Sequence, residues 1–211
     1  MPTLNVSGTL ADALAACAPF PVVVADGGST DASIALAEAA GARVVRAPRG
    51  RGSQLAAGAA VAETPWLLFL HADTRLAPGW PEAVRAAMAR PDRAAYARFT
   101  LDDPAPQARR RERLGAWRCR VLALPYGDQG LLISRTLYDA VGGFRPLPLM
   151  EDVDLVRRLG RHRLAALPVA AVTSAARWRR DGWWRRSARN LGCLSLYFLG
   201  LPPALIRRLY G

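Results

Sequence analysis

The chain of 211 residues contains no lysine, and all 29 of its basic residues are arginine. A standard phosphate-binding P-loop needs a lysine, and no Gly-x-Gly-x-x-Gly segment follows a predicted strand. Histidine is also scarce, because His71 and His162 are the only two, and neither forms a convincing hydrolase triad or zinc site. These absences exclude several common classes of nucleotide-binding protein and hydrolase.

Cysteine is scarce as well. Cys17, Cys119 and Cys193 lie far apart and are odd in number, which fits neither a disulfide framework nor metal-ligand spacing. The sequence therefore favours a reducing compartment, and we expect a cytoplasmic protein. Residues 1–5 lack the basic and apolar regions of a signal peptide, so we expect none at this end.

Acidic residues are fewer than basic ones. The chain has 17 acidic residues and 29 arginines, which gives a formal net charge of +12. The guanidinium group pairs with phosphate through two parallel hydrogen bonds, so anionic substrates and anionic membranes are natural partners. Nucleic acid is a third candidate. The hydrophobic share of 51% allows one domain of ordinary size to bury a full core.

Helices and strands alternate in the first half of the chain. We expect helices over residues 9–16, 31–40, 53–62 and 81–89, and strands over residues 22–25, 42–46, 66–70 and 94–101. Ser29 or Thr30 is expected to cap the second helix, and Ser53 the third. This order predicts an α/β fold with a mostly parallel central sheet flanked by helices.

The second half is less regular. A strongly basic helix is expected over residues 107–124, a short strand over 130–134, a helix over 151–159 and a further strand or pair of strands over 165–173. Arginine, tryptophan and leucine dominate the rest, which we expect to form a C-terminal helical tail.

The segment from Val22 to Asp31 reads Val-Val-Val-Ala-Asp-Gly-Gly-Ser-Thr-Asp. Its β-branched residues predict a buried strand that ends at Asp26, with a helix after the glycine turn. A carboxylate at the carboxyl end of a parallel strand, near a helix N-terminus, lies where open α/β sheets bind nucleotides. An ordinary strand–turn–helix is the alternative.

A second polar pair follows the apolar strand at residues 66–70. His71 and Asp73 are two residues apart, so their side chains point to the same side of an extended chain. Asp73 could hold a divalent metal that also contacts a diphosphate, because Mg²⁺ and Mn²⁺ favour one or two carboxylates plus phosphate oxygens. A strand-end aspartate that starts a turn is the alternative.

A third acidic group opens the helix expected at residues 151–159. Glu151 and Asp152 suit the helix dipole, so simple capping is one interpretation, and a general base facing a cleft is the other. Asp154 is four residues ahead of Arg158, and we expect these two side chains to pair on the helix surface.

Together these three motifs resemble those of the inverting family 2 glycosyltransferases of GT-A fold. The matching segments are Val23–Asp31, His71–Asp73 and Glu151–Leu155, with further likeness at Gly50–Gln54, Gly142–Phe144 and Arg177–Trp178. The ordered set covers nearly the whole chain. It is most similar to a short bacterial subgroup with Asp-Gly-Gly-Ser-Thr-Asp and an arginine- and leucine-rich tail.

The resemblance implies a role for each matching residue. Asp152 is the expected catalytic base with Glu151 beside it, and Asp73 the expected ligand of Mg²⁺ or Mn²⁺. Asp26 is expected to contact the base or ribose of the nucleotide, and Arg177 and Trp178 to lie near the diphosphate or the acceptor. The nucleotide-sugar site implied in this way comprises Asp26, Gly27, Arg51, His71, Asp73, Arg177 and Trp178.

The sequence departs from the family pattern at several of these positions. His71 replaces the first aspartate of Asp-x-Asp, and Gly27 stands where many relatives carry a second aspartate. Ser174 stands where processive relatives have glutamine, which argues against a polymerising synthase. Residues 1–6 begin inside the apolar strand of relatives, so we expect a shortened central strand.

The tail after residue 176 combines arginine, tryptophan and an apolar run. Residues 177–189 hold three tryptophans among six arginines, and residues 191–201 are almost entirely apolar but too short to span a bilayer, which needs about 20 residues. This composition is typical of a membrane-surface element. The alternative is a helix packed on the sheet with a solvated arginine face.

We therefore expect a GT-A-like domain at residues 1–176 and a helical tail at 177–211, packed on the domain or on the inner face of the cell membrane. The expected activity is metal-assisted transfer of a sugar, with inversion, from a UDP-sugar to an acceptor that could be lipid-linked. No nucleic-acid partner is expected. The alternative is a non-catalytic, basic peripheral-membrane or nucleic-acid-binding protein on a degenerate transferase fold.

Overall fold

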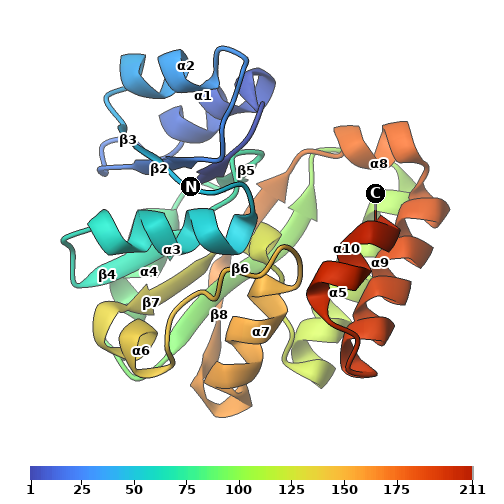
Figure 1. Ribbon diagram of the computed structural model, residues 1–211. Coiled ribbons are helices and arrows are strands. Elements are labelled where there is room, and N and C mark those ends of the chain that lie inside the picture. Colours follow the sequence, from blue (N-terminus) through green and yellow to red (C-terminus); the bar gives the residue numbers. More distant parts are fainter. Residues whose placement is uncertain (211) are drawn as a thin grey trace.

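The computed structural model describes residues 1–210, with side chains as far as Arg208, so Gly211 of the predicted tail lies outside the described residues. Two sheets flanked by helices form an α/β fold (Figure 1). The strands are β1 Pro2–Thr3, β2 Val23–Asp26, β3 Arg43–Arg46, β4 Trp66–Phe69, β5 Thr74–Leu76, β6 Ala94–Leu101, β7 Leu131–Ser134 and β8 Leu164–Thr173. The helices are α1 Ser7–Ala15, α2 Ser33–Ala39, α3 Arg51–Val61, α4 Trp80–Ala87, α5 Pro106–Leu122, α6 Arg135–Ala140, α7 Glu151–Leu159, α8 Ala176–Asp181, α9 Trp183–Phe198 and α10 Pro203–Tyr210.

The expected fold class is confirmed, and the first sheet is entirely parallel. Its strands have the order β1-β2-β3 and both pairs are parallel. The second sheet has the order β4-β7-β6-β8-β5 and is mixed. In it β6 and β8 are parallel, whereas β7 is antiparallel to both of its neighbours and β5 is antiparallel to β8.

The first strand is short, as expected, and the two sheets separate beside it. Pro2 and Thr3 pair with Ala25 and Asp26 of β2. Two residues offer few backbone groups for a second ladder, and β1 pairs with β2 alone in the described sheets. An apolar cavity lies on this side of β2, with Val22, Val23 and residues 66–70 in its lining.

The expected helix caps are wrong. α2 begins at Ser33, so Ser29 and Thr30 precede it, and its start is held by Asp31, whose carboxylate accepts from the backbone N–H of Ser33. α3 begins at Arg51, two residues before Ser53, which therefore lies inside the helix.

Buried contacts made by α3, α7 and α9 hold these helices in place, and the helices form one wall of the cleft described below. Leu55 of α3 and Leu155 of α7 belong to one buried cluster with the second sheet. Val153 of α7 and Leu194 of α9 belong to another. The first sheet and the C-terminal helices α8, α9 and α10 lie on opposite sides of α7 (Figure 1). Among the described residues, no helix is both long enough and apolar enough to cross a membrane.

Candidate functional site

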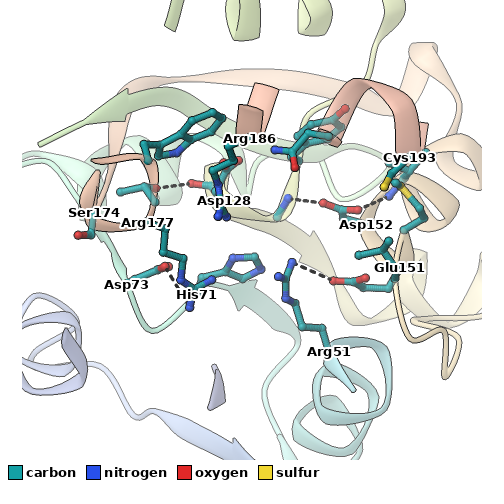
Figure 2. A pocket seen from close by; sticks show the side chains of 18 residues that line it. Arg51, His71, Asp73, Asp128, Glu151, Asp152, Ser174, Arg177, Arg186 and Cys193 are labelled. Atoms are coloured by element: carbon teal, nitrogen blue, oxygen red, sulfur yellow. Dashed lines mark hydrogen bonds and ion pairs between the residues drawn. The ribbon is translucent and has the colours of Figure 1, made fainter. Parts of the chain in front are cut away.

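Two adjoining pockets open beyond the end of β4. The α9 pocket, as we name the first, is lined by residues of α7, α8 and α9 and by the turn at residues 126–128 (Figure 2). The second, named the β1 pocket, is lined by β1, the loop before α3 and the start of α3. The residues that line both pockets are Arg51, His71, Asp73 and Arg177. These four side chains form a shared wall, so the pockets are two halves of one cleft.

The structure brings together seven of the nine residues that the sequence nominated. Asp26 and Gly27 line neither half of the cleft, whereas the other seven all line the α9 pocket. These seven are Arg51, His71, Asp73, Glu151, Asp152, Arg177 and Trp178.

Asp73 reaches the cleft because the strand after it pairs with β8. The hydroxyls of Thr74 and Thr173 lie 2.9 Å apart, and the N–H of Ser174 donates to the carbonyl of Asp73 at 3.0 Å. This pairing brings the start of α8 beside Asp73, whose carboxylate lies 3.9 Å from Nη2 of Arg177. A strand-end carboxylate and an arginine of the C-terminal segment therefore meet.

His71 lies between the two halves of the cleft. Burial, together with the charge of Arg51, lowers the pKa of His71 to about 4. The imidazole is therefore neutral at pH 7 and can offer a nitrogen lone pair. A side chain at Gly127 would place its Cβ 2.6 Å from Nε2 of His71, so glycine is required for this turn to lie against the ring.

Glu151 and Asp152 both line the cleft at the start of α7, but their surroundings differ. Glu151 is 2% exposed and lies 3.8 Å from Nη1 of Arg51. Burial raises the pKa of Glu151 to about 7, with Asp152 adding to the shift, and Arg51 opposes it only in part. The carboxylate of Asp152 accepts hydrogen bonds from the N–H of Gly127 at 2.8 Å and of Val153 at 2.7 Å, which fix its orientation.

Asp154 pairs with Arg158 at 2.6 Å, as expected, but the expected surface position is wrong. The side chain of Asp154 is 10% exposed and also lies 3.2 Å from Arg145. Arg158 in turn donates to the carbonyl of Gly143 at 2.7 Å. Asp154 therefore ties α7 to the loop before it and does not line the cleft.

Asp26 is directed into its own turn. Its carboxylate accepts from the N–H groups of Gly28 and Ser29 at 2.8 and 2.9 Å, and from the hydroxyl of Thr3 at 3.3 Å. Burial by itself raises the pKa of Asp26, but the hydrogen bonds from Ser29, Gly28 and Thr3 outweigh it and lower the pKa below its usual value. Thr3 lines the β1 pocket, so Asp26 shapes that pocket through Thr3.

Trp178 lines the α9 pocket with little of its surface exposed. Its ring stacks on Trp183 with centroids 5.8 Å apart, and the guanidinium carbons of Arg111 and Arg186 lie 4.8 and 5.3 Å from its centroid. The cationic tail therefore forms part of the cleft wall. Arg186, Asn190 and Cys193 continue this wall along α9.

Asp128 is a pocket carboxylate that no sequence motif indicated. It lines the α9 pocket, and its Oδ1 atom is buried without a hydrogen-bond partner in the described residues. Burial raises the pKa of Asp128 to about 6. Thr173 donates to its carbonyl at 3.2 Å and so fixes the turn (Figure 2). An aspartate in a Gly-Asp turn is an ordinary turn former, so the sequence carried no signal of this position.

The β1 pocket carries an excess of positive charge. Four arginines line it, and Asp73 is the one acidic residue among its described lining residues. These arginines are Arg49, Arg51, Arg177 and Arg207. Arg49 and Arg207 were not nominated from the sequence, because an isolated arginine in an arginine-rich chain gives no signal. This half of the cleft is suited to bind a di- or triphosphate.

A metal ion would have a limited set of protein ligands here. No group of three or more His, Cys, Asp or Glu side chains in the described part of the chain could hold one. Asp73 and His71 offer oxygen and nitrogen donors next to a pocket suited to phosphate. Such a site fits an ion whose remaining ligands are phosphate oxygens and water, as Mg²⁺ and Mn²⁺ prefer.

The family model for "Glycosyl transferase family 2" matches residues 1–148, and the chain belongs to this family. No curated protein matches the chain. Among solved structures, glucosyl-3-phosphoglycerate synthase from Mycobacterium tuberculosis with phosphoglyceric acid is similar to it, with 21% identity over 82% of this chain and 68% of that chain and a TM-score of 0.57.

The same enzyme with Mn²⁺, UDP and glucosyl-3-phosphoglycerate gives 22% identity, the same two coverages and a TM-score of 0.56. Its complex with UDP gives 20% identity, again over 82% and 68% of the two chains, and a TM-score of 0.59. At this identity the likeness establishes a GT-A-like fold and leaves the substrates of this chain to be argued from its own cleft.

Proposed function

We propose that this protein transfers a sugar from a nucleoside-diphosphate sugar to an acceptor hydroxyl, with inversion at the sugar carbon. The observation that carries the proposal is one cleft with a phosphate-suited, arginine-lined half and a half in which the carboxylate of Asp152 is held in a fixed orientation. Family membership supports the reaction class.

The donor is assigned to the β1 pocket. Arg51 and Arg177 stand between the two halves, where they can neutralise the diphosphate as it leaves the sugar. We expect UDP as the nucleotide, because the structurally similar synthase was crystallised with UDP and with UDP-glucose. Asp26 would act on the nucleotide indirectly, through Thr3.

Asp73, with His71 beside it, would hold a divalent cation. That cation, Mg²⁺ or Mn²⁺, would supply positive charge to the departing diphosphate. The similar synthase was crystallised with Mn²⁺ and UDP-glucose, which favours Mn²⁺ as the first ion to try.

The acceptor is assigned to the α9 pocket. Asp152 would take the proton of the acceptor hydroxyl as the new bond forms, which makes it the general base. Asp128 also lines this pocket and adds a further acidic group to it. Substrate screening should include free acceptors such as phosphoglyceric acid, with which the similar synthase was crystallised, and lipid-linked ones.

The alternative is a non-catalytic, basic protein on a degenerate transferase fold that binds a membrane surface or a nucleic acid. His71 in place of an aspartate is the observation that favours it. A protein of that kind would bind no nucleoside diphosphate in a metal-dependent manner.

Thermal unfolding with a panel of nucleoside diphosphates, with and without Mn²⁺, distinguishes the two proposed functions. A ligand at 100 times its Kd adds about 2.7 kcal/mol to stability, so the expected result is a rise in Tm with one nucleotide and Mn²⁺ together. Asp73→Asn should remove the Mn²⁺-dependent part of this rise, and Asp92→Asn, which changes an exposed acid, should retain it. If no nucleoside diphosphate raises the Tm, the proposed function is wrong.

A further inference from the structure

The end of α9 is a tight reversal. Gly200 has a φ of 89°, which favours glycine. The N–H of Gly200 donates to the carbonyl of Tyr197, and that of Leu201 donates to the carbonyl of Leu196, each at 3.0 Å. This is the Schellman pattern of a helix C-terminus. α10 then begins at Pro203, and it lies back along α9 (Figure 1).

One buried side chain holds α10 against the rest of the molecule. Ile206 is 0% exposed, whereas its neighbours Leu205, Arg207 and Arg208 are exposed. Successive residues of a helix point about 100° apart, so the burial of Ile206 decides which way the two arginines face. Arg207 lines the β1 pocket together with Pro148 and Arg49, and Arg208 does not.

Of the four arginines that line the β1 pocket, two lie within ion-pair distance of a described carboxylate and two do not. Arg51 lies near Glu151 at 3.8 Å and Arg177 near Asp73 at 3.9 Å. The ion pairs between described residues include neither Arg49 nor Arg207. These two arginines therefore add positive charge to the pocket that no described carboxylate offsets, and a phosphate group would.

We infer that Arg207 binds a phosphate of the nucleoside diphosphate, and that α10 forms an outer wall of the donor site. The inference rests on the proposed assignment of the donor to the β1 pocket. It gives the last helix of the basic tail a role in the cleft, whereas the sequence nominated only Arg177 and Trp178 of the tail for the site. Arg207 is then a binding residue that lies 30 positions beyond Arg177 in the chain.

The test compares Arg207→Gln with Arg208→Gln. The two variants lose the same charge from adjacent positions of one helix, both at exposed side chains, and differ in that Arg207 alone of the pair lines the pocket. Binding of UDP with Mn²⁺ is measured by isothermal titration calorimetry at low salt, and uridine serves as a probe without phosphate. Thermal unfolding without ligand confirms that the variants are equally folded.

Arg207→Gln should weaken UDP binding about tenfold, which corresponds to ~1.4 kcal/mol, and leave uridine binding unchanged. Arg207→Lys should recover most of the affinity, because lysine still supplies a charge that can reach phosphate. Arg208→Gln should bind UDP as the wild type does.

The inference is overturned if Arg207→Gln binds UDP like the wild type, or if Arg208→Gln loses as much affinity, since a general charge effect would then suffice. Both of these results require a wild-type protein that binds UDP, and they leave the proposed function standing. A wild type that binds neither UDP nor any other nucleoside diphosphate removes the proposed function and this inference together.

Discussion

Glu151 and Asp152 are neighbours in the sequence, and the fold gives them different surroundings. Glu151 is buried beside Arg51 with a raised pKa, and Asp152 receives two backbone N–H groups at the cleft. A carboxyl group that carries its proton near neutral pH is a poor acceptor of another proton. Of the two residues that the sequence nominated, Asp152 is therefore the one that we propose as the general base.

Asp152→Asn should lower turnover by roughly 10²–10⁴-fold, the usual contribution of a general base, and leave donor affinity unchanged. The measurement is transfer kinetics with the donor and acceptor that the screen identifies, together with calorimetric donor binding. Asp12→Asn, at an exposed acid that lines neither pocket, serves as the control. Equal turnover in the Asp152 variant and the wild type would assign the base elsewhere, with Asp128 and Glu151 as the next candidates.

Glu151 should make stability depend on pH in a predictable direction. Its pKa is 4.5 in the reference state and about 7 in the folded protein, so between these values the folded state binds the extra proton. Glu151 therefore contributes its full stabilisation to the folded protein below about pH 4.5, and this contribution is lost as the pH rises through about 7. Relative to Glu151→Gln, the wild-type protein should lose free energy of unfolding across this window.

Chemical denaturation at pH 4.5, 6 and 8 measures this difference. Glu63→Gln, whose side chain is 91% exposed, is the control and should track the wild type at every pH. Parallel stability curves for the wild type and Glu151→Gln would contradict the prediction.

At the scale of elements, α9 has two unlike faces. Arg186, Asn190 and Cys193 face the α9 pocket. Trp184, Leu191 and Phe198, spaced seven residues apart, are 73%, 65% and 49% exposed and lie on the opposite face. On α5, Leu114, Trp117 and Val121 are also exposed, among arginines. Exposed aromatic and apolar side chains beside cationic ones are typical of a membrane-surface helix.

We expect the protein to bind anionic vesicles, to bind neutral ones more weakly, and to release the anionic ones as salt rises. Replacing Trp184, Leu191 and Phe198 by serine should abolish vesicle binding in co-sedimentation, while UDP binding persists because the pocket face is unchanged. A wild type that ignores anionic vesicles would refute membrane docking. If sedimentation velocity then shows a dimer that the triple variant loses, this face binds a second copy of the chain.

At the scale of the whole molecule, the tail and the rest of the chain share buried clusters. Leu194 packs with Val153 and Val156 of α7, and Trp178 packs with Phe99 and Leu101 of β6. The cleft itself is lined by residues from both sides of the expected boundary at residue 176. We therefore expect residues 1–176 and residues 177–211 to unfold together, although the two segments differ in composition.

Thermal unfolding of the full chain should show a single transition, because the C-terminal helices cannot leave without exposing these clusters. Differential scanning calorimetry measures this, with circular dichroism as a second probe. Two separated transitions would refute the prediction, and so would a 1–176 fragment that retains the Tm of the full chain.

The sequence by itself determined the elements whose signals are local. Helix α7 at residues 151–159 and strand β6 at residues 94–101 have the predicted bounds, because helical and strand periodicity and first-turn acids act over a few residues. The ordered motifs also predicted the family, which the family model confirms, and they nominated seven residues that do line the cleft.

The tertiary structure alone decided which nominated groups face the cleft. Asp26, which was nominated, turns into its own loop, while Asp128 and Arg207, which carried no motif, line the pockets. The physical reason is that a side chain's direction depends on how its element packs against residues far away in the chain. The burial of Ile206 directs Arg207, and the pairing of β5 with β8 brings Asp73 to Arg177. Periodicity within one segment contains no information on either contact.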